Sequence, residues 1–188
     1  MVRTIGRQLD TLSSVVKTLL ANDIPGAVGG ACAVYARGGP LPDGYSAVQV
    51  LLRPADAPRA RAALLGTGLR APDAADESRI LLYDRDVRVD LLFRPNGQEV
   101  SAELLARADR LPVGRIEAPV VTVADLLIGE LLVLDPHRVD FTRLLHIARE
   151  LRAQVDWPRV HAETAASPYA RAFLGLLDDP GITAQKGS

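Results

Sequence analysis

The sequence has little cysteine, few aromatic residues and no long apolar run. Its single cysteine, Cys32, excludes an internal disulfide. Aromatic residues are only 4% of the 188 residues, so the core must be built mainly from Leu, Val, Ala and Ile. No run of about 18 apolar residues exists, so we expect no membrane span. The N-terminus shows no signal-peptide segment. Together these features predict a cytoplasmic protein.

The chain also lacks an excess of charge of either sign. It has 22 basic and 23 acidic residues, a formal net charge of -1 and no basic stripe. Nucleic-acid binding through phosphate neutralisation is therefore disfavoured. The hydrophobic content of 48% and the charged content of 24% are typical of a globular chain. A length of 188 residues allows one domain, or one domain with a small appendage.

Apolar spacing predicts a helix and then a strand-turn-helix unit at the start of the chain. Residues 3–21 have the spacing of a helix, and residues 24–28 are suited to a short buried strand. Gly29-Gly30 then permits a tight turn into a short helix over 31–36. Residues 40–44 contain helix and strand breakers, which predicts a loop.

The middle of the chain alternates as β-strands do. Residues 45–52 read YSAVQVLL; their even positions are typical of a core face, and their odd positions suit a cleft face. The further predicted elements are a helix over 54–65, a strand hairpin over 79–83 and 87–93, a helix over 100–108 and an extended segment over 113–121. Residues 1–121 therefore predict an α/β core with a mixed sheet flanked by helices.

The last third of the chain is predicted to be helical. Thr122 and Asp125 have the spacing of a capping pair before an apolar helix over 126–134. Further helices are predicted over 139–153, 158–165 and 168–177. We therefore expect three parts, which are the core over 1–121, a helical C-terminal subdomain over 122–180 and a flexible tail over 181–188.

Three short stretches resemble the nucleotidyltransferase superfamily, in its small bacterial minimal or toxin-like branch. They are Val28-Gly29-Gly30-Ala31-Cys32-Ala33-Val34-Tyr35, the strand Val48-Gln49-Val50-Leu51-Leu52, and Val89-Asp90-Leu91-Leu92. Asp125-Leu126-Leu127 and residues 131–134 are similar to the family's downstream helix. The resemblance covers roughly residues 5 to 150 and implies a nucleotidyltransferase-like mixed sheet.

The resemblance also implies a metal site, and this sequence departs from it. In that family the Gly-Gly helix start cradles a nucleoside triphosphate, and the next strand carries two aspartates one residue apart. A neighbouring strand supplies a third carboxylate, which Asp90 matches, but the paired aspartates fall on Ala47 and Gln49. Two Mg²⁺ ions need several charged oxygen ligands, so we expect no bound metal and no cofactor. Glu130 stands where the family's lysine is expected.

The remaining polar and aromatic groups define a candidate small-molecule site. Asp90 and Gln49 are the candidate catalytic residues, because the resemblance places both in one cleft. The candidate ligand-binding residues are Gly29, Gly30, Tyr35, Tyr45, Ala47 and Tyr83. Structural alternatives stay open: Asp90 pairs with Arg88 or Arg53, the tyrosines pack in the core or rim, and Cys32 is inert packing. The three histidines share no metal-ligand spacing.

These observations lead to three hypotheses. The first is a degenerate nucleotidyltransferase fold, in which the cleft binds a small molecule or runs a metal-independent reaction, for instance in specialised metabolism. The second is an active Mg²⁺-dependent nucleotidyltransferase, including the toxin-like members that modify tRNA; an alignment shifted to Asp43 would favour it, but Asp43 lies in the loop over 40–44. The third is a non-catalytic interaction or regulatory partner, with an exposed apolar surface on the C-terminal helices. No sequence feature specifies the ligand or an oligomeric state.

Overall fold

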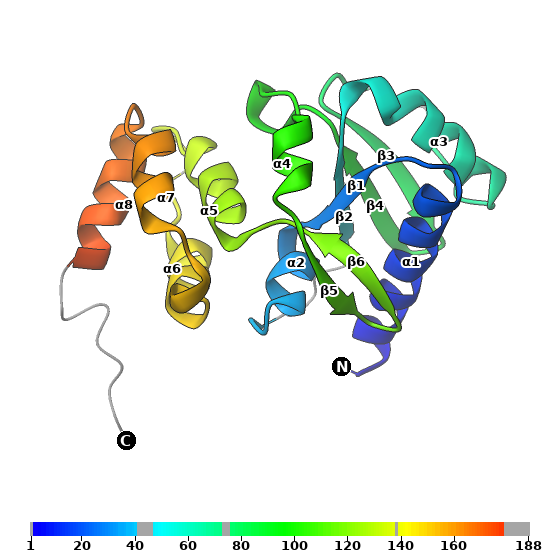
Figure 1. Ribbon diagram of the computed structural model, residues 1–188, viewed down its shortest axis with the longest axis horizontal. Coiled ribbons are helices and arrows are strands. Elements are labelled where there is room, and N and C mark those ends of the chain that lie inside the picture. The colour runs from blue at the N-terminus through cyan, green and yellow to red at the C-terminus, as the bar shows by residue number, and fades with distance from the viewer. Residues whose placement is uncertain (1, 41–46, 73–75, 138, 179–188) are drawn as a thin grey trace. The chain divides into compact units, whose positions relative to one another are not determined.

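The computed structural model describes residues 2–40, 47–72, 76–137 and 139–178, with the backbone alone for residues 2–5 (Figure 1). The chain divides into two compact units, Met1–Val121 and Thr122–Ser188. Asp43, Tyr45 and the tail over 181–188, which the sequence analysis named, lie outside the described residues. None of the described helices is both long enough and apolar enough to cross a membrane.

The first unit is a mixed α/β structure. Its described helices are α1 (Val2–Ala21), α2 (Gly30–Ala36), α3 (Ala57–Gly66) and α4 (Ala102–Ala106). Its strands are β1 (Gly26–Gly29), β2 (Ala47–Leu52), β3 (Arg79–Asp84), β4 (Val87–Leu92), β5 (Asp109–Val113) and β6 (Ile116–Val120). These bounds agree closely with the prediction from β1 through β4.

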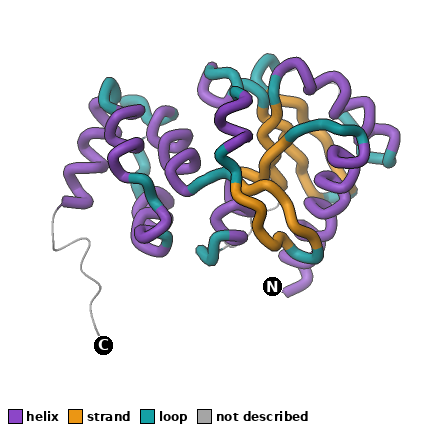
Figure 2. The backbone as a smooth tube through the Cα atoms, viewed as in Figure 1, coloured by secondary structure: helices purple, strands orange, loops and turns teal. Residues whose placement is uncertain are grey.

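The six strands form one sheet in the order β3-β4-β2-β1-β6-β5. Figure 2 draws the strands in orange. β2 runs parallel to β4 and β1 runs parallel to β6, whereas the other three neighbouring pairs are antiparallel. Gly29 pairs with Gln49, and Gln49 pairs in turn with Asp90. The predicted mixed sheet is confirmed, and the two candidate polar residues lie on neighbouring strands as expected.

One face of this sheet is apolar and packs on helices. Val48, Val50 and Leu52 on β2 are at most 1% exposed, so the even positions face the core as predicted. α1 contacts β2, β4 and α3 (Figure 1). The Thr11 hydroxyl on α1 donates a 2.6 Å hydrogen bond to Asp84 at the end of β3. Because side chains alternate along a strand, the odd positions of β2 face away from α1.

The segment predicted as one extended stretch over 113–121 is instead the second half of a hairpin. β5 and β6 pair in antiparallel register around a turn at Gly114, whose φ is +62°. A Cβ at Gly114 would lie 3.2 Å from the Cβ of Leu9 on α1, so this turn requires glycine. The predicted helix over 100–108 is longer than α4, because its last two residues connect α4 to β5. β5 reads DRLPV, which lacks a clear alternation of apolar and polar residues.

The described part of the second unit is helical, as predicted. It contains α5 (Val123–Leu132), α6 (Thr142–Glu150), α7 (Trp157–Thr164) and α8 (Pro168–Asp178). α6 is shorter than the predicted helix over 139–153. Thr122 caps α5, since its hydroxyl accepts from the Asp125 backbone N–H at 3.1 Å and donates to the Asp125 carboxylate at 2.6 Å.

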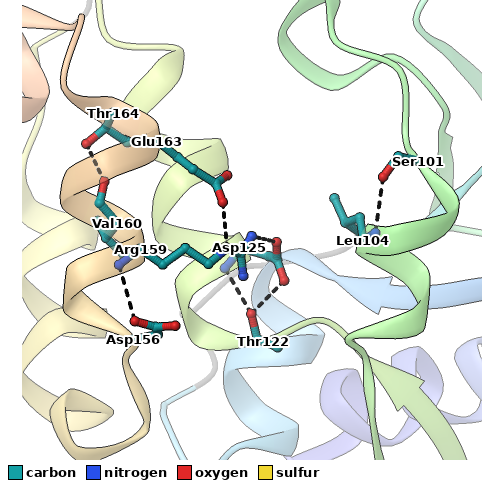
Figure 3. Close-up of polar contacts among 9 residues, drawn as sticks. All are labelled: Ser101, Leu104, Thr122, Asp125, Asp156, Arg159, Val160, Glu163 and Thr164. Atoms are coloured by element: carbon teal, nitrogen blue, oxygen red, sulfur yellow. Dashed lines mark hydrogen bonds and ion pairs between the residues drawn. The ribbon is translucent and has the colours of Figure 1, made fainter.

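An ion-pair network joins two helices of this unit (Figure 3). Arg159 on α7 donates to Asp125 on α5, and also to Glu163 one turn further along α7 at 2.6 Å. The Asp125 side chain is only 5% exposed. The hydrogen bond to Asp125 raises the pKa of Arg159 above its ordinary value, so this side chain stays charged. The Thr122 cap and this ion pair together anchor the beginning of α5 to α7.

Candidate functional site

The strand register brings several polar residues of β2, β3 and β4 together on the face opposite α1. Tyr83 of β3 pairs with Arg88 of β4, and Gln49 of β2 pairs with Asp90 of β4. Arg79 of β3 pairs with Leu92, two residues beyond Asp90, and therefore lies on the same face. We call this surface the polar face; it is formed by Gln49, Arg79, Tyr83, Arg88 and Asp90.

Asp90 lies at the centre of the polar face and is completely buried. The Nε and Nη2 atoms of Arg88 both lie 3.0 Å from Asp90 Oδ2. Arg79 approaches from the neighbouring strand, with Nη1 3.7 Å from Asp90 Oδ1. At this distance Arg79 forms an ion pair and no hydrogen bond, and Oδ1 accepts no hydrogen bond from any described residue. Two guanidinium groups therefore surround one carboxylate.

The ion pairs continue from Arg79 to the residues before β3. Arg79 Nε lies 2.9 Å from Asp76 Oδ2. Asp76 also accepts hydrogen bonds from the hydroxyl and the backbone N–H of Ser78. Those bonds, with a smaller contribution from Arg79, hold the pKa of Asp76 below its ordinary value. The charges thus alternate along the series Asp76, Arg79, Asp90 and Arg88.

The residues of the polar face do not fit a pair of divalent metal ions. Ala47, which lies beside Arg88 in register, has no ligand atom and is buried. Gln49 contributes a neutral amide, and Asp90 is already paired with two arginines. Across the described residues, no group of three His, Cys, Asp or Glu side chains is placed to hold a metal ion. Asp43, the alternative ligand, lies outside them.

The Gly29-Gly30 turn into α2 is packed against a leucine. Gly30 has a φ of +58°, a left-handed conformation that favours glycine. An ideal Cβ at Gly29 would lie 2.4 Å from Leu51 Cδ1, so the Leu51 side chain covers Gly29 closely. Leu51 lies two residues after Gln49 on β2 and therefore points to the polar face. The backbone conformation therefore favours glycine at position 30, and the close packing of Leu51 favours glycine at position 29.

Of the other residues singled out from the sequence, only some lie on the polar face. Tyr83 joins the polar face beside Arg88, whereas Tyr35 is on the last turn of α2 and is 40% exposed. Cys32 is buried within α2, and this burial raises the pKa of its thiol to about 11. The sequence left Arg88 and Arg53 as alternative partners of Asp90. Arg53 pairs instead with Asp56 at 2.8 Å, and Arg88 is the one that pairs with Asp90.

Two residues of this surface were not predicted as site residues. The alternation in Val87–Leu92 already places Arg88 and Asp90 on one side of β4, and this signal identifies Arg88. Arg79 had no comparable signal. It reaches Asp90 only because β3 pairs with β4 in the observed register.

The fold is similar to that of known structures. A solution structure of the antibiotic-resistance factor ANT(2'')-Ia aligns with a TM-score of 0.65 and 14% identity, covering 90% of this chain and 95% of that one. A crystal structure of ANT(2'')-Ia in complex with adenylyl-2''-tobramycin aligns with a TM-score of 0.62 and 13% identity, covering 90% and 98%. No protein-family model and no curated protein sequence matches the chain. The chain has a nucleotidyltransferase-like fold.

Proposed function

We propose that this protein binds a small molecule on the polar face, and that it does not perform metal-dependent nucleotidyl transfer. The observation that carries the proposal is the pairing of Asp90. Its carboxylate is fully buried between Arg88 and Arg79, and the neighbouring position on β2 is Gln49. The family that the sequence resembles clusters carboxylates at this place, whereas Ala47 and Gln49 stand at two of those positions here and two arginines flank the remaining carboxylate.

Electrostatics supports this reading. A divalent cation at Asp90 would meet two guanidinium groups within a few ångströms. Two unit charges about 4 Å apart interact by about 4 kcal/mol at an effective dielectric constant of about 20, and the repulsion doubles for a divalent ion. A single carboxylate that is already ion-paired offers too little compensation for the dehydration of Mg²⁺.

Packing at the start of α2 also favours a ligand other than a nucleoside triphosphate. The Leu51 side chain lies over Gly29, at the helix start where the family resemblance would place phosphate groups. α2 has seven residues, so its helix dipole is short. A ligand on the polar face would instead be oriented by the Gln49 amide, the Tyr83 hydroxyl and the arginines. Such groups also suit a metal-independent reaction that exchanges a proton with the ligand.

Titration with Mn²⁺ tests the proposal, because bound Mn²⁺ broadens the NMR signals of nearby nuclei. We expect no selective broadening of the amides of Gln49 and Asp90 at an equimolar concentration of Mn²⁺. Selective loss of these signals at low-micromolar Mn²⁺ would refute the proposal.

The Gln49→Asp variant is a suitable positive control. It places a second carboxylate beside Asp90 in the parallel register of β2 and β4. We expect this variant to gain affinity for Mn²⁺ relative to the natural chain, since each added carboxylate strengthens a hard-cation site. Glu117→Gln, an exchange on β6 away from the polar face, serves as the neutral control.

A further inference from the structure

The charges of the polar face are not equally available to solvent. The Arg88 and Arg79 side chains are 44% and 40% exposed, whereas the Asp90 side chain is 0% exposed. A ligand approaching this face therefore meets guanidinium groups first and the carboxylate only beneath them. Asp76 is the exposed acidic partner, and it is engaged by Arg79 and Ser78.

The two guanidinium groups have N–H donors beyond those that contact Asp90 and Asp76. Arg88 uses Nε and Nη2 on Asp90, and Arg79 uses Nε on Asp76 and directs Nη1 at Asp90. A guanidinium carries five N–H donors in a planar fork, so each arginine retains N–H groups that no described residue occupies. Such forks match the oxygens of a carboxylate or phosphate.

A third arginine extends this cationic surface. Arg70 and Tyr83 form an antiparallel bridge through two backbone hydrogen bonds of 2.9 and 2.8 Å. Directly opposed residues of a bridge point to the same side, so Arg70 lies on the side of Tyr83 and Arg88. Arg70 is exposed, and among the described residues its side chain donates one long hydrogen bond, of 3.5 Å, to the Arg85 carbonyl.

We propose that Arg88 and Arg79 bind an oxyanion, a carboxylate or a phosphate group, of the small molecule that this protein recognises. The inference rests on the proposed function and specifies its ligand class. Asp90 is the buried counter-charge that holds the two guanidinium groups next to one another. Arg70 adds positive charge at the edge of the site, and Tyr83 separates it from Arg88.

Two-dimensional NMR titrations of the full chain in EDTA test this inference. The probes are inorganic phosphate, succinate and 1,4-diaminobutane; the last two have the same four-carbon length and opposite charge. We expect phosphate or succinate to shift the Nε–H signals of Arg88 and Arg79 with a millimolar midpoint, and 1,4-diaminobutane to leave them unchanged. A tighter response to phosphate identifies a phosphorylated ligand, and a tighter response to succinate identifies a carboxylic acid.

Variants connect the response to these residues. Arg79→Gln should weaken the anion response about tenfold to a hundredfold, because it removes a charged hydrogen-bond donor. Arg94→Gln is the matched control: Arg94 is 47% exposed and paired with Glu99 at 2.8 Å, and it should leave the response unchanged. Arg88→Gln alone leaves Asp90 poorly paired, so the double variant Arg88→Gln/Asp90→Asn is the folded test of Arg88. It too should weaken the response.

The possible failures are distinguishable. Absence of any anion response at the arginines, or an equal response in Arg79→Gln and Arg94→Gln, overturns the oxyanion site. A response of the same signals to 1,4-diaminobutane alone overturns it in favour of a cationic ligand. In both cases, if Mn²⁺ does not broaden the Gln49 and Asp90 signals, the proposal of metal-independent small-molecule binding is retained. Mn²⁺ binding at Gln49 and Asp90 refutes that proposal independently of the anion titrations.

Discussion

The pairing of Asp90 with Arg88 has an energetic signature that a double-mutant cycle can measure. The perturbations are Arg88→Gln, Asp90→Asn and the two together. Arg88→Gln leaves a fully buried carboxylate whose remaining partner, Arg79, is 3.7 Å away. Asp90→Asn instead leaves an arginine that is 44% exposed and can be hydrated.

The magnitudes follow from this asymmetry. Removing one partner of a fully buried ion pair costs about 3–5 kcal/mol. Solvent reaches Arg88 and Arg79 still compensates part of the charge, so we expect about 1–3 kcal/mol for Arg88→Gln. Asp90→Asn should cost about 1 kcal/mol, the value of an ordinary hydrogen bond. The double variant should be more stable than Arg88→Gln alone, because it no longer buries an unpaired charge.

Hydrogen exchange of the β2 and β4 amides is the appropriate assay, since it reports the stability of the first unit directly. The single tryptophan, Trp157, lies in α7 of the second unit and would not report on it. The reasoning is refuted if Asp90→Asn destabilises the Arg88→Gln background as much as it destabilises the natural chain. That result would mean that the two side chains do not interact energetically.

Three further predictions concern other parts of the chain. Gly30→Ala should destabilise the first unit by about 1–2 kcal/mol, because its φ is +58°, whereas Gly6→Ala in α1 should be neutral or stabilising; thermal melting compares them. Cys32 should resist a thiol reagent at pH 8, because burial raises its pKa to about 11 and the thiol stays protonated; rapid labelling of the folded chain would contradict this. Arg159→Met should destabilise the second unit by about 2–4 kcal/mol, because it leaves the buried Asp125 carboxylate without its arginine. Urea unfolding followed by Trp157 fluorescence measures it, and Glu163→Gln, at a 47% exposed residue, should change stability by less than about 0.5 kcal/mol.

Much of the sheet could be predicted because local patterns determine it. The alternation in β2 placed Val48, Val50 and Leu52 in the core, and the glycine pair marked the strand-to-helix turn before α2. β5 was missed because an exposed edge strand needs no apolar alternation, and its residues are mostly solvent-facing.

The candidate site was less predictable because it depends on register between strands. Gln49 and Asp90 were expected on neighbouring strands, and they are adjacent in the β2–β4 pairing. The approach of Arg79 to Asp90 requires the β3–β4 register, and the contact of Leu51 with Gly29 requires the β1–β2 register. Neither contact has a signal in the local sequence, since each joins residues more than ten positions apart.

Calorimetric titration with ATP, once with Mg²⁺ and once with EDTA, tests the central claim most directly. The account predicts that Mg²⁺ does not increase the affinity and that any binding of ATP stays in the millimolar range, about −4 kcal/mol. Because Asp90 is engaged by Arg88 and Arg79, this carboxylate is a poor ligand for a metal ion that bridges to the phosphates. A Mg²⁺-dependent isotherm with a low-micromolar dissociation constant, lost in Asp90→Asn and retained in Asp86→Asn, would contradict it.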